Sequence, residues 1–265
     1  MARSGFEQQV VWITGASSGI GAALAEAFSR LGARVVLSAR RVAELEKVRA
    51  RCERPADHFV LPLDMASADF AQSVADVLAR YGRIDVLINN AGISQRSRVA
   101  QTGLDVDRRI MEVNYFGVVA LTRAVLPVMQ RQGSGHIIVV SSLVGLISTP
   151  MRSTYAASKH ALHGFFEALR AEEYDNGIRV LMVCPGSVRT EVSVHALAGD
   201  GSEHGVVDEM IGNGLDPAVC ADRILAALKA GREQVLVSGP ERLAVTLYKI
   251  LPSLYRRLVR RAKVT

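Results

Sequence analysis

The residues best suited to chemistry are Tyr155 and Lys159, which stand four positions apart in a segment whose apolar spacing predicts a helix. Residues at this spacing share one face of a helix, so we expect the phenol and the ammonium to lie within reach of each other. A free tyrosine has a pKa of about 10, and proton exchange with a substrate near neutral pH requires that pKa to fall by roughly 3 units. A neighbouring cation supplies a field of the required sign. The pair therefore predicts proton transfer, although a Tyr and a Lys at this spacing are more often a simple surface pair.

A second pattern is the glycine-rich run Thr14-Gly15-Ala16-Ser17-Ser18-Gly19-Ile20-Gly21, which follows an apolar run and opens a helix-like segment. Gly15 permits a tight turn, Gly19 lets the backbone approach a pyrophosphate, and Gly21 lets the helix pack closely on the strand. Phosphates then bind at the helix N-terminus, where backbone N–H groups lack partners. No Lys-Ser or Lys-Thr pair follows the last glycine, which disfavours a nucleotide triphosphatase. The alternative is an ordinary glycine-rich turn.

The residues after the second predicted strand bear on the choice between NAD and NADP. A site for NAD uses an Asp or Glu about 20 residues beyond the glycines to bind the ribose 2′-hydroxyl. Residues 33–43 contain no acidic residue, and Ser38, Arg40 and Arg41 offer a hydroxyl and two cations instead. Such groups suit the dianionic 2′-phosphate. The sequence therefore favours NADP over NAD, with two solvated arginines as the alternative interpretation.

These residues need a scaffold, and the pattern of the chain predicts one. Apolar runs predict strands at 10–14, 34–38, 58–63, 84–89, 136–141, 178–184 and 234–237, and helical periodicity predicts helices at 19–31, 42–52, 66–81, 104–131, 153–176 and 217–230. Several strands are apolar without alternation, which indicates that both faces are covered. Strands separated by single helices form right-handed βαβ units. We therefore expect an α/β fold, with a doubly wound, Rossmann-like parallel sheet of about seven strands flanked by helices on both faces, in a single domain.

Two segments depart from this alternation. Residues 190–215 hold five glycines among short apolar pieces. Because a long irregular segment in a compact domain is usually functional, we expect a substrate lid there, within a domain that spans 1–240. Residues 241–265 form a basic amphipathic extension, with leucines at helix-like spacing interrupted by Pro252. This extension could lie on an anionic membrane surface, or pack on its own domain or on a second subunit.

Composition limits the class of protein. The chain has 265 residues, of which 49% are hydrophobic and 22% charged, so it is neither disordered nor fibrous. The net charge of +6 is matched by six basic residues in 249–265, a stretch without acids, so we expect no nucleic-acid partner. Three widely spaced cysteines argue against disulfides or a metal site and favour a reducing, cytoplasmic setting. We expect a cytoplasmic protein, peripheral at the inner membrane face if the extension binds lipid.

Taken together, the motifs resemble those of the short-chain dehydrogenase/reductase family over about residues 8–240. The resemblance rests on the glycine-rich run at 14–21, Asn89-Asn90-Ala91-Gly92 after the fourth strand, Asn114 in the next helix, Ser142 thirteen positions before Tyr155, the Tyr155 and Lys159 pair, and Pro185-Gly186 after the sixth strand. Shorter runs at 37–41, 94–97 and 158–162 resemble the branch that contains 11β-hydroxysteroid dehydrogenase-like and retinal-type reductases.

The resemblance implies roles for individual residues. Tyr155 would be the general acid in reduction or the base in oxidation, and Lys159 would lower its pKa and hold the nicotinamide ribose. Ser142 would bind the substrate oxygen, and Asn114 would support a water between Lys159 and solvent. The residues implied to contact the cofactor are Gly15, Ser17, Ser18, Gly19, Ile20, Gly21, Ser38, Arg40, Arg41, Asp64, Met65, Asn90, Ala91, Gly92, Tyr155, Lys159, Pro185, Gly186, Val188 and Thr190. Many NADP-dependent relatives carry a basic residue where this chain has Ser18, which leaves Arg40 and Arg41 to bind the 2′-phosphate.

The expected function is that of an NADP-dependent oxidoreductase that transfers hydride between the nicotinamide and a carbonyl or secondary alcohol. The expected substrate is a lipophilic ketone, aldehyde, sterol or retinoid, with a 3-oxoacyl thioester on an acyl carrier protein as the alternative. Leu143, Val144, Ile147 and Met151 would line an apolar pocket in either case. A non-catalytic, dinucleotide-sensing scaffold is the alternative of another class. By analogy with relatives, we expect a homo-oligomer, a dimer or tetramer, paired through the helices that contain Asn114 and Tyr155.

Overall fold

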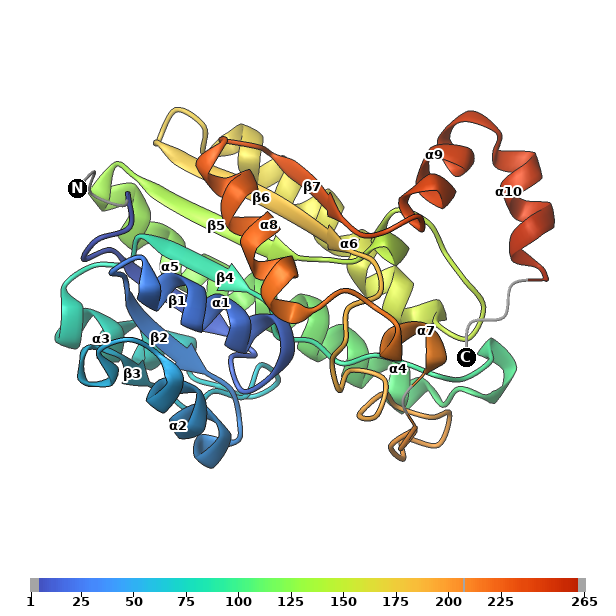
Figure 1. The fold of residues 1–265 in the computed structure, drawn as a ribbon, viewed down its shortest axis with the longest axis horizontal. Helices are drawn as coiled ribbons and strands as arrows, with labels where there is room; N and C mark the ends of the chain where they lie inside the picture. Colours follow the sequence, from blue (N-terminus) through green and yellow to red (C-terminus); the bar gives the residue numbers. More distant parts are fainter. Residues whose placement is uncertain (1–4, 207, 262–265) are drawn as a thin grey trace.

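The computed structural model describes residues 5–206 and 208–261 and is built around a seven-stranded sheet of order β3-β2-β1-β4-β5-β6-β7 (Figure 1). Every neighbouring pair of strands is parallel. The strands are β1 (Val10–Thr14), β2 (Arg34–Ser38), β3 (Phe59–Val60), β4 (Val86–Asn89), β5 (Gly135–Val140), β6 (Ile178–Pro185) and β7 (Gln234–Val237). The strand order reverses between β1 and β4, and ligands of such sheets bind at that point, outside the carboxyl ends of the strands.

Helices cover both faces of the sheet, which confirms the predicted doubly wound α/β fold (Figure 1). One face carries α1 (Gly19–Arg30), α2 (Val42–Arg51) and α8 (Pro217–Lys229), and the other carries α3 (Phe70–Tyr81), α5 (Gly117–Gln132) and α6 (Ser153–Glu172). The remaining helices are α4 (Leu104–Met111) before α5, the short α7 (Glu209–Gly212), and α9 (Arg242–Ile250) and α10 (Pro252–Val259) near the C-terminus.

The core explains why the strands are apolar on successive residues. Along β1, Val11 and Ile13 pack with α1, α2 and α8, whereas Val10 and Trp12 pack with α3, α5 and α6. Side chains alternate between the faces of a strand, so a strand buried on both faces needs apolar residues throughout. Trp12 is fully buried and donates a hydrogen bond from Nε1 to Oγ of Ser38, at 2.9 Å. This bond ties β1 to β2 below the site.

Three predicted boundaries were wrong by several residues. The helix predicted at 66–81 begins at Phe70, because the side chain of Asp69 accepts a hydrogen bond from the backbone N–H of Gln72 at 3.0 Å and caps the helix there. The strand predicted at 58–63 pairs with β2 over Phe59–Val60. The helix predicted to reach 176 ends at Glu172, before a turn that carries Gly177 at φ +74°.

The helix predicted at 104–131 contains a wide turn. A π-helical segment at Glu112–Phe116 separates α4 from α5, and Asn114 lies within it. Such π segments are found frequently at functional sites. The whole stretch Leu104–Gln132 is long and apolar enough to cross a membrane by length and composition, a test that the core helix of a soluble protein also passes. In its α5 part, Leu121 and Val125 are buried in the core that covers one face of the sheet.

The two irregular segments of the sequence both lie against the domain. In the 190–215 segment, Leu197 pairs with the loop after β4 through backbone bonds with Ser94 and Arg96, each at 2.9 Å. The extension predicted at 241–265 is described as far as 261, and within that range α9 and α10 form a hairpin (Figure 1). Lys263 lies outside the described residues. Val245 and Tyr255 are buried against Leu143, at the end of β5.

Candidate active site

A cavity of about 770 Å³ opens at the carboxyl ends of the strands, across the point where the strand order reverses. Its size is that of a typical small-molecule site. Every catalytic or cofactor-contacting residue predicted from the sequence lines this cavity, with the exceptions of Gly21 and Asn114. Those residues come from the segments after β1, β2, β3, β4, β5 and β6 and from α6, so the parallel sheet brings distant segments of the chain to one place.

The glycine-rich loop has the geometry that its sequence predicts. Gly15 and Gly19 adopt φ of +65° and +54°, a region that favours glycine. A Cβ on Gly21 would lie 2.2 Å from the carbonyl oxygen of Gly15, so a side chain there would push α1 away from the loop. Gly21 therefore contributes to packing and not to the cavity wall.

The first turn of α1 suits a phosphate group. Ser17, Ser18, Gly19 and Ile20 line the cavity at the N-terminus of this helix. The side chain of Ser18 makes no capping hydrogen bond, which leaves the first backbone N–H groups of α1 open to a ligand. The glycine cradle and this helix terminus together fit the pyrophosphate of a dinucleotide.

The loop after β4 is locked to the loop after β1. The hydroxyl of Thr14 accepts hydrogen bonds from the backbone N–H groups of Asn90 and Ala91, at 3.0 and 3.1 Å. The side-chain amide of Asn90 donates to the carbonyl oxygens of Thr14 and Gly15, at 3.0 and 3.1 Å. The side chain of Asn90 thus holds the loop after β4 against the loop after β1, and the backbone of the loop after β4 forms part of the cavity wall.

The residues after β2 lie at the edge of the cavity. Arg40 and Arg41 are exposed, and Nη2 of Arg41 lies 4.0 Å from a carboxylate oxygen of Glu191. Ser38 also lines the cavity, but it is fully buried and its Oγ already accepts the hydrogen bond from Trp12. The two arginines, more than the serine hydroxyl, are therefore placed to meet an anionic group.

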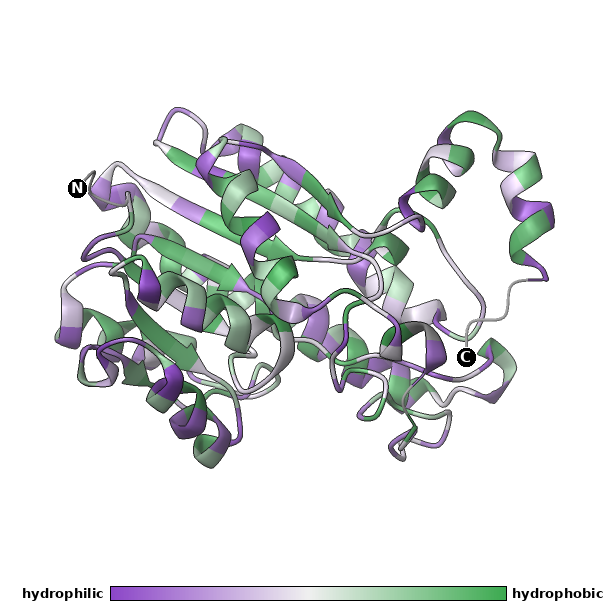
Figure 2. Cartoon of the chain, in the orientation of Figure 1, coloured by the Kyte–Doolittle hydropathy of each residue, from purple (hydrophilic) through white to green (hydrophobic). Residues whose placement is uncertain are grey.

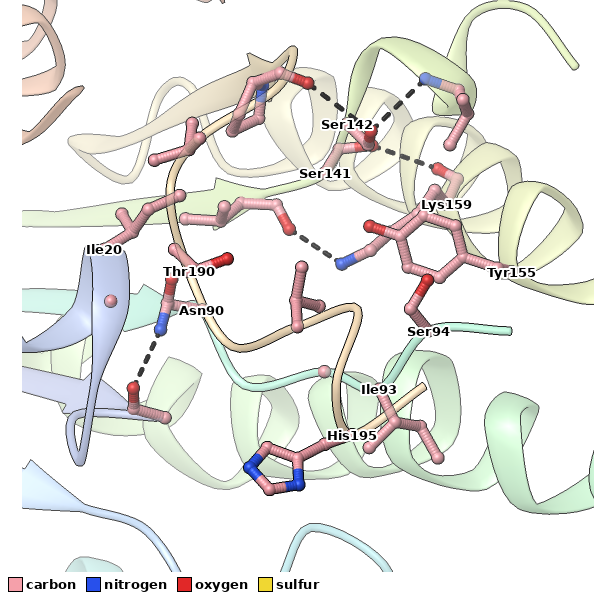
Figure 3. A pocket seen from close by; sticks show the side chains of 18 of the residues that line it. Ile20, Asn90, Ile93, Ser94, Ser141, Ser142, Tyr155, Lys159, Thr190 and His195 are labelled. Carbon is pink, nitrogen blue, oxygen red and sulfur yellow. Dashed lines mark hydrogen bonds between the residues drawn. The ribbon is translucent and has the colours of Figure 1, made fainter. Parts of the chain in front are cut away.

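Tyr155 and Lys159 face the cavity from α6, as the spacing predicts (Figure 3). Nζ of Lys159 lies 5.8 Å from the centre of the Tyr155 ring. Ser142 stands beside them at the end of β5, where its Oγ accepts from the backbone N–H of Val144 at 3.3 Å. The structure thus brings together a phenol, an ammonium and a hydroxyl, the groups expected to handle a substrate oxygen.

Lys159 is almost wholly buried, and its Nζ donates a hydrogen bond to the carbonyl oxygen of Val140 at 2.9 Å. Burial lowers the pKa of Lys159 from 10.5 to about 8, with the nearby Cys184 acting in the opposite direction. A Cβ on Gly92 would lie 3.5 Å from Nζ, so the loop after β4 passes directly by the ammonium. Lys159 therefore remains cationic at neutral pH in a confined site.

Burial raises the pKa of Tyr155, because a phenolate is poorly solvated in this position. Arg152, a hydrogen bond from Ser142 and Arg96 act in the opposite direction and favour the phenolate, in that order of size. The sequence predicts such stabilisation from Lys159 and from a cationic oxidised nicotinamide. The contribution of the two arginines was not predicted.

Asn114 lies behind the cavity wall and is fully buried. Its Oδ1 accepts from the backbone N–H of Ile93 at 2.8 Å, and its Nδ2 donates to the carbonyl oxygen of Ile93 at 2.9 Å and to Oγ of Ser158 at 3.1 Å. Asn114 therefore fixes the backbone next to Gly92 and hence next to Lys159. The wide turn in the helix gives its side chain this position.

Two parts of the cavity wall were missed by the sequence analysis. The hairpin of α9 and α10 contributes Ala244, Leu247, Tyr255, Leu258 and Val259, so the extension forms part of the pocket. Tyr255 anchors it through a hydrogen bond from its hydroxyl to the carbonyl oxygen of Ser148, at 2.8 Å. The second part is formed by Arg96 and Arg152, which pair with the buried carboxylate of Asp208 behind the cavity wall. These three residues are far apart in sequence, and no spacing rule marks them.

Of the four residues expected to form an apolar lining, Leu143, Val144 and Ile147 do so. Met151 is not part of the lining and has a positive φ of +67°. Within the described ranges, no group of three His, Cys, Asp or Glu side chains is placed to hold a metal ion.

Comparisons with known proteins agree with this geometry. The family model described as short chain dehydrogenase matches residues 9–200. A dehydrogenase/reductase SDR family protein 7-like from Drosophila melanogaster is 47% identical over 254 residues, which cover 93% of this chain and 78% of the relative.

Two solved structures share the fold. A short chain dehydrogenase/reductase from Burkholderia phymatum, in complex with NAD, superposes with a TM-score of 0.82 at 24% identity and covers 96% of each chain. An alcohol dehydrogenase from the archaeon Thermococcus sibiricus, complexed with 5-hydroxy-NADP, has a TM-score of 0.76 and 29% identity, over 88% of this chain and 97% of the other.

Proposed function

The chain belongs to the short-chain dehydrogenase/reductase family, and we propose that it is an NADP-dependent reductase or dehydrogenase of lipophilic carbonyl and alcohol substrates. Membership of this family makes it an oxidoreductase that acts by hydride transfer. The cofactor preference and the substrate class are the proposed part.

The observation that carries the proposal is the convergence of Tyr155, Lys159 and Ser142 on one wall of a cavity whose opposite wall holds the glycine-rich loop and Thr190 (Figure 3). A bound nicotinamide dinucleotide supplies the hydride in such an enzyme. The protein must then supply orientation and a proton.

We assign the proton to the Tyr155 hydroxyl. In reduction, this O–H donates its proton to the carbonyl oxygen of the substrate, and in oxidation the phenolate accepts the proton of the alcohol. Ser142 donates a second hydrogen bond to the same oxygen and fixes its position. Lys159 and its positive charge favour the phenolate. Asn114 keeps the loop beside Lys159 in place.

NADP is proposed because the edge of the cavity after β2 carries Arg40 and Arg41, both exposed. A guanidinium pairs with a phosphate through parallel hydrogen bonds. The described residues of that loop, 39–43, include no carboxylate to bind a free ribose 2′-hydroxyl. The complex of the Thermococcus sibiricus relative with 5-hydroxy-NADP is consistent with this preference.

A lipophilic substrate is proposed because the remaining wall of the cavity is largely apolar. Leu143, Val144 and Ile147 line it from the segment after β5, and Leu247 and Leu258 from the C-terminal hairpin. Apolar walls with a few placed polar groups are typical of sites for small apolar ligands.

The test is a turnover assay that follows NADPH absorbance with a long-chain 2-ketone, a steroid ketone, retinaldehyde and a 3-oxoacyl thioester. We expect oxidation of NADPH with at least one free lipophilic carbonyl, and a kcat/KM at least about tenfold lower with NADH. Turnover of the thioester alone would contradict the lipophilic substrate in favour of the alternative. Binding of NADPH without turnover of any carbonyl would contradict the enzyme and favour a dinucleotide-sensing protein.

We also propose that the C-terminal hairpin rests on an anionic membrane surface. The hairpin packs on the domain through Val245 and Tyr255. Hydrophobic and hydrophilic residues alternate along both of its helices (Figure 2). The exposed apolar residues are Leu243, Ile250, Leu251, Leu254 and Leu258, and the basic residues beside them are Lys249, Arg256, Arg257, Arg260 and Arg261. Such a surface matches acyl chains beside anionic headgroups, and each basic residue near the lipid contributes about 1 kcal/mol.

Flotation with vesicles that contain about one-third anionic lipid tests the membrane proposal. We expect the wild-type chain to float and the Ile250→Ser/Leu251→Ser/Leu254→Ser variant to remain in solution. Val99→Ser, which changes an apolar residue 74% exposed elsewhere, is the matched control and should float. Equal recovery of wild type and triple variant in the soluble fraction would contradict the proposal.

A homo-oligomer paired through α5 and α6 is proposed by analogy with the family. Phe116, at the start of α5, is 52% exposed and stacks edge-on against Tyr115, which in turn contacts Phe165 of α6. Light scattering should give a dimer or tetramer for the wild type and a monomer for Phe116→Asp. A monomeric wild type would contradict this pairing.

A further inference from the structure

A buried cluster of three charged side chains lies beside Tyr155. Arg96 donates from Nε to a carboxylate oxygen of Asp208 at 2.7 Å, and Nη2 of Arg152 lies 3.4 Å from the same oxygen. The side chains of Arg96 and Asp208 are each 1% exposed, and that of Arg152 is 12% exposed. Two guanidinium groups thus share the charge of this one carboxylate. Charges this deeply buried interact strongly, since little water screens them.

The three residues come from separate parts of the fold. Arg96 follows β4, where its guanidinium is also held by the hydroxyl of Ser94 and the carbonyl oxygen of Gln95, at 2.8 and 2.6 Å. Arg152 immediately precedes α6, three residues before Tyr155. Asp208 belongs to the 190–215 segment, and its backbone N–H donates to Oγ of Ser193 at 3.3 Å. The carboxylate therefore links that segment to both arginines.

Tyr155 lies within the electrostatic range of this cluster. Both arginines line the same cavity, and both favour the phenolate. Lys159 lies on the same helix as Tyr155, and Nε2 of His204 lies 3.6 Å from a carboxylate oxygen of Asp208. Further charged or titratable groups that line the cavity include Arg109, His195, Glu203 and Glu241. Asp208 pairs with both arginines of the cluster, so its negative charge opposes theirs.

We propose that Asp208 and Arg152 are positioning residues whose opposite charges set the electrostatic field at the Tyr155 hydroxyl. The carboxylate of Asp208 partly neutralises the two arginines and so favours the protonated phenol. Without that carboxylate, the positive charges of the arginines would favour the phenolate. The inference rests on the proposed role of Tyr155, but its charge relationship exists without cofactor or substrate.

The test is the titration of Tyr155 in the free protein, followed through the Cζ resonance of ¹³C-tyrosine and identified by its loss in Tyr155→Phe. Asp208→Asn removes the negative charge, so the titration midpoint should fall by about one pH unit. Arg152→Gln removes a positive charge, and the midpoint should rise or leave the window of about pH 7 to 11. The double variant Asp208→Asn/Arg152→Gln should lie between the two single variants.

Two matched controls carry similar charge changes away from the cluster. Asp200→Asn alters an exposed carboxylate of the same segment, and Arg98→Gln alters an exposed arginine two residues after Arg96. Neither should move the midpoint. If Asp208→Asn fails to fold, Arg152→Gln is compared with Arg152→Lys, which keeps the positive charge: the midpoint should rise in Arg152→Gln and stay near that of the wild type in Arg152→Lys. Equal midpoints in these two variants would contradict the charge effect.

An unchanged midpoint in both single variants, or shifts in the same direction, would overturn the proposal. The result is independent of turnover. Opposite shifts in a protein that oxidises no NADPH would refute the proposed function and leave the charge relationship in place, whereas turnover without shifts would do the reverse.

Discussion

Nζ of Lys159 lies 5.8 Å from the centre of the Tyr155 ring and donates its hydrogen bond to the carbonyl oxygen of Val140. The ammonium is therefore oriented by the end of β5, and its charge is held next to the phenol without direct contact between the two groups. The loop at Gly92 passes close to the ammonium, since a Cβ on Gly92 would lie 3.5 Å from Nζ. The ammonium of Lys159 is buried, and burial disfavours its charged form.

Replacement of the Tyr155 hydroxyl should abolish turnover. Tyr155→Phe removes the proposed acid while the ring remains, and loss of general acid catalysis costs about 10² to 10⁴ in kcat. Steady-state kinetics measure the loss, and NADPH fluorescence titration should show nearly unchanged cofactor affinity. Tyr174→Phe, at a residue 54% exposed and outside the cavity, is the control and should retain full activity. A Tyr155→Phe variant with more than a few per cent of the wild-type rate would overturn the assignment.

The buried charge of Lys159 should lower the stability of the free protein at neutral pH. The pKa of Lys159 falls from 10.5 to about 8 on folding. Burial of the protonated side chain therefore lowers the free energy of unfolding at pH 7 by an amount on the order of 3 kcal/mol. Lys159→Met removes the charge but leaves the carbonyl of Val140 without this donor, which costs about 1 kcal/mol. We expect a net gain of about 2 kcal/mol at pH 7, measured by urea unfolding.

The lowered pKa of Lys159 also predicts how the stability of the protein changes with pH. Between pH 8 and 10.5 the unfolded chain binds more protons at Lys159 than the folded chain does, so wild-type stability rises with pH in that window. The advantage of Lys159→Met should therefore shrink from pH 7 to pH 10. Lys47→Met, at a side chain 66% exposed, should show no such trend. An advantage that is constant with pH would exclude the buried charge as its cause.

Removal of the two arginines after β2 should weaken NADPH selectively. Each charge-assisted hydrogen bond to a phosphate contributes about 1.5 to 3 kcal/mol, so Arg40→Ala and Arg41→Ala should each raise KM for NADPH about 10- to 100-fold and change that for NADH little. Arg49→Ala, on the solvent side of α2 with Glu46 as its ion-pair partner, is the control and should affect neither cofactor. Equal effects on both cofactors would contradict recognition of the 2′-phosphate.

Two glycine substitutions should have opposite effects on stability. In Gly21→Ala the new Cβ would meet the Gly15 carbonyl oxygen at 2.2 Å, so overpacking should lower the free energy of unfolding by about 1 to 3 kcal/mol. In Gly164→Ala, at an exposed position of α6, the Cβ has nothing within 4 Å, and the variant should gain about 0.5 to 1 kcal/mol. Thermal unfolding of both proteins measures this contrast. Similar stabilities for the two variants would show that the close approach of α1 to the loop is relaxed in solution.

The sequence alone was sufficient for the sheet, the glycine-rich loop and the pair on α6. Each of these depends on local rules: apolar runs on β1 reflect burial on both faces, Gly15 and Gly19 meet a backbone requirement, and residues four apart on a helix share a face. Since parallel strands bring their carboxyl ends to one edge, these local signals already predict that the loops meet.

Only the tertiary structure decided what surrounds that pair. Asp208 lies 112 positions from Arg96 in sequence, and its choice of partner follows from how the 190–215 segment packs on the loop after β4. The same holds for Tyr255. Its sequence predicts only an amphipathic helix, whereas in the structure Tyr255 lines the cavity and its hydroxyl donates a hydrogen bond to the carbonyl oxygen of Ser148. Periodicity records which face of an element is buried, whereas the partner of that face depends on contacts between segments that no local spacing encodes.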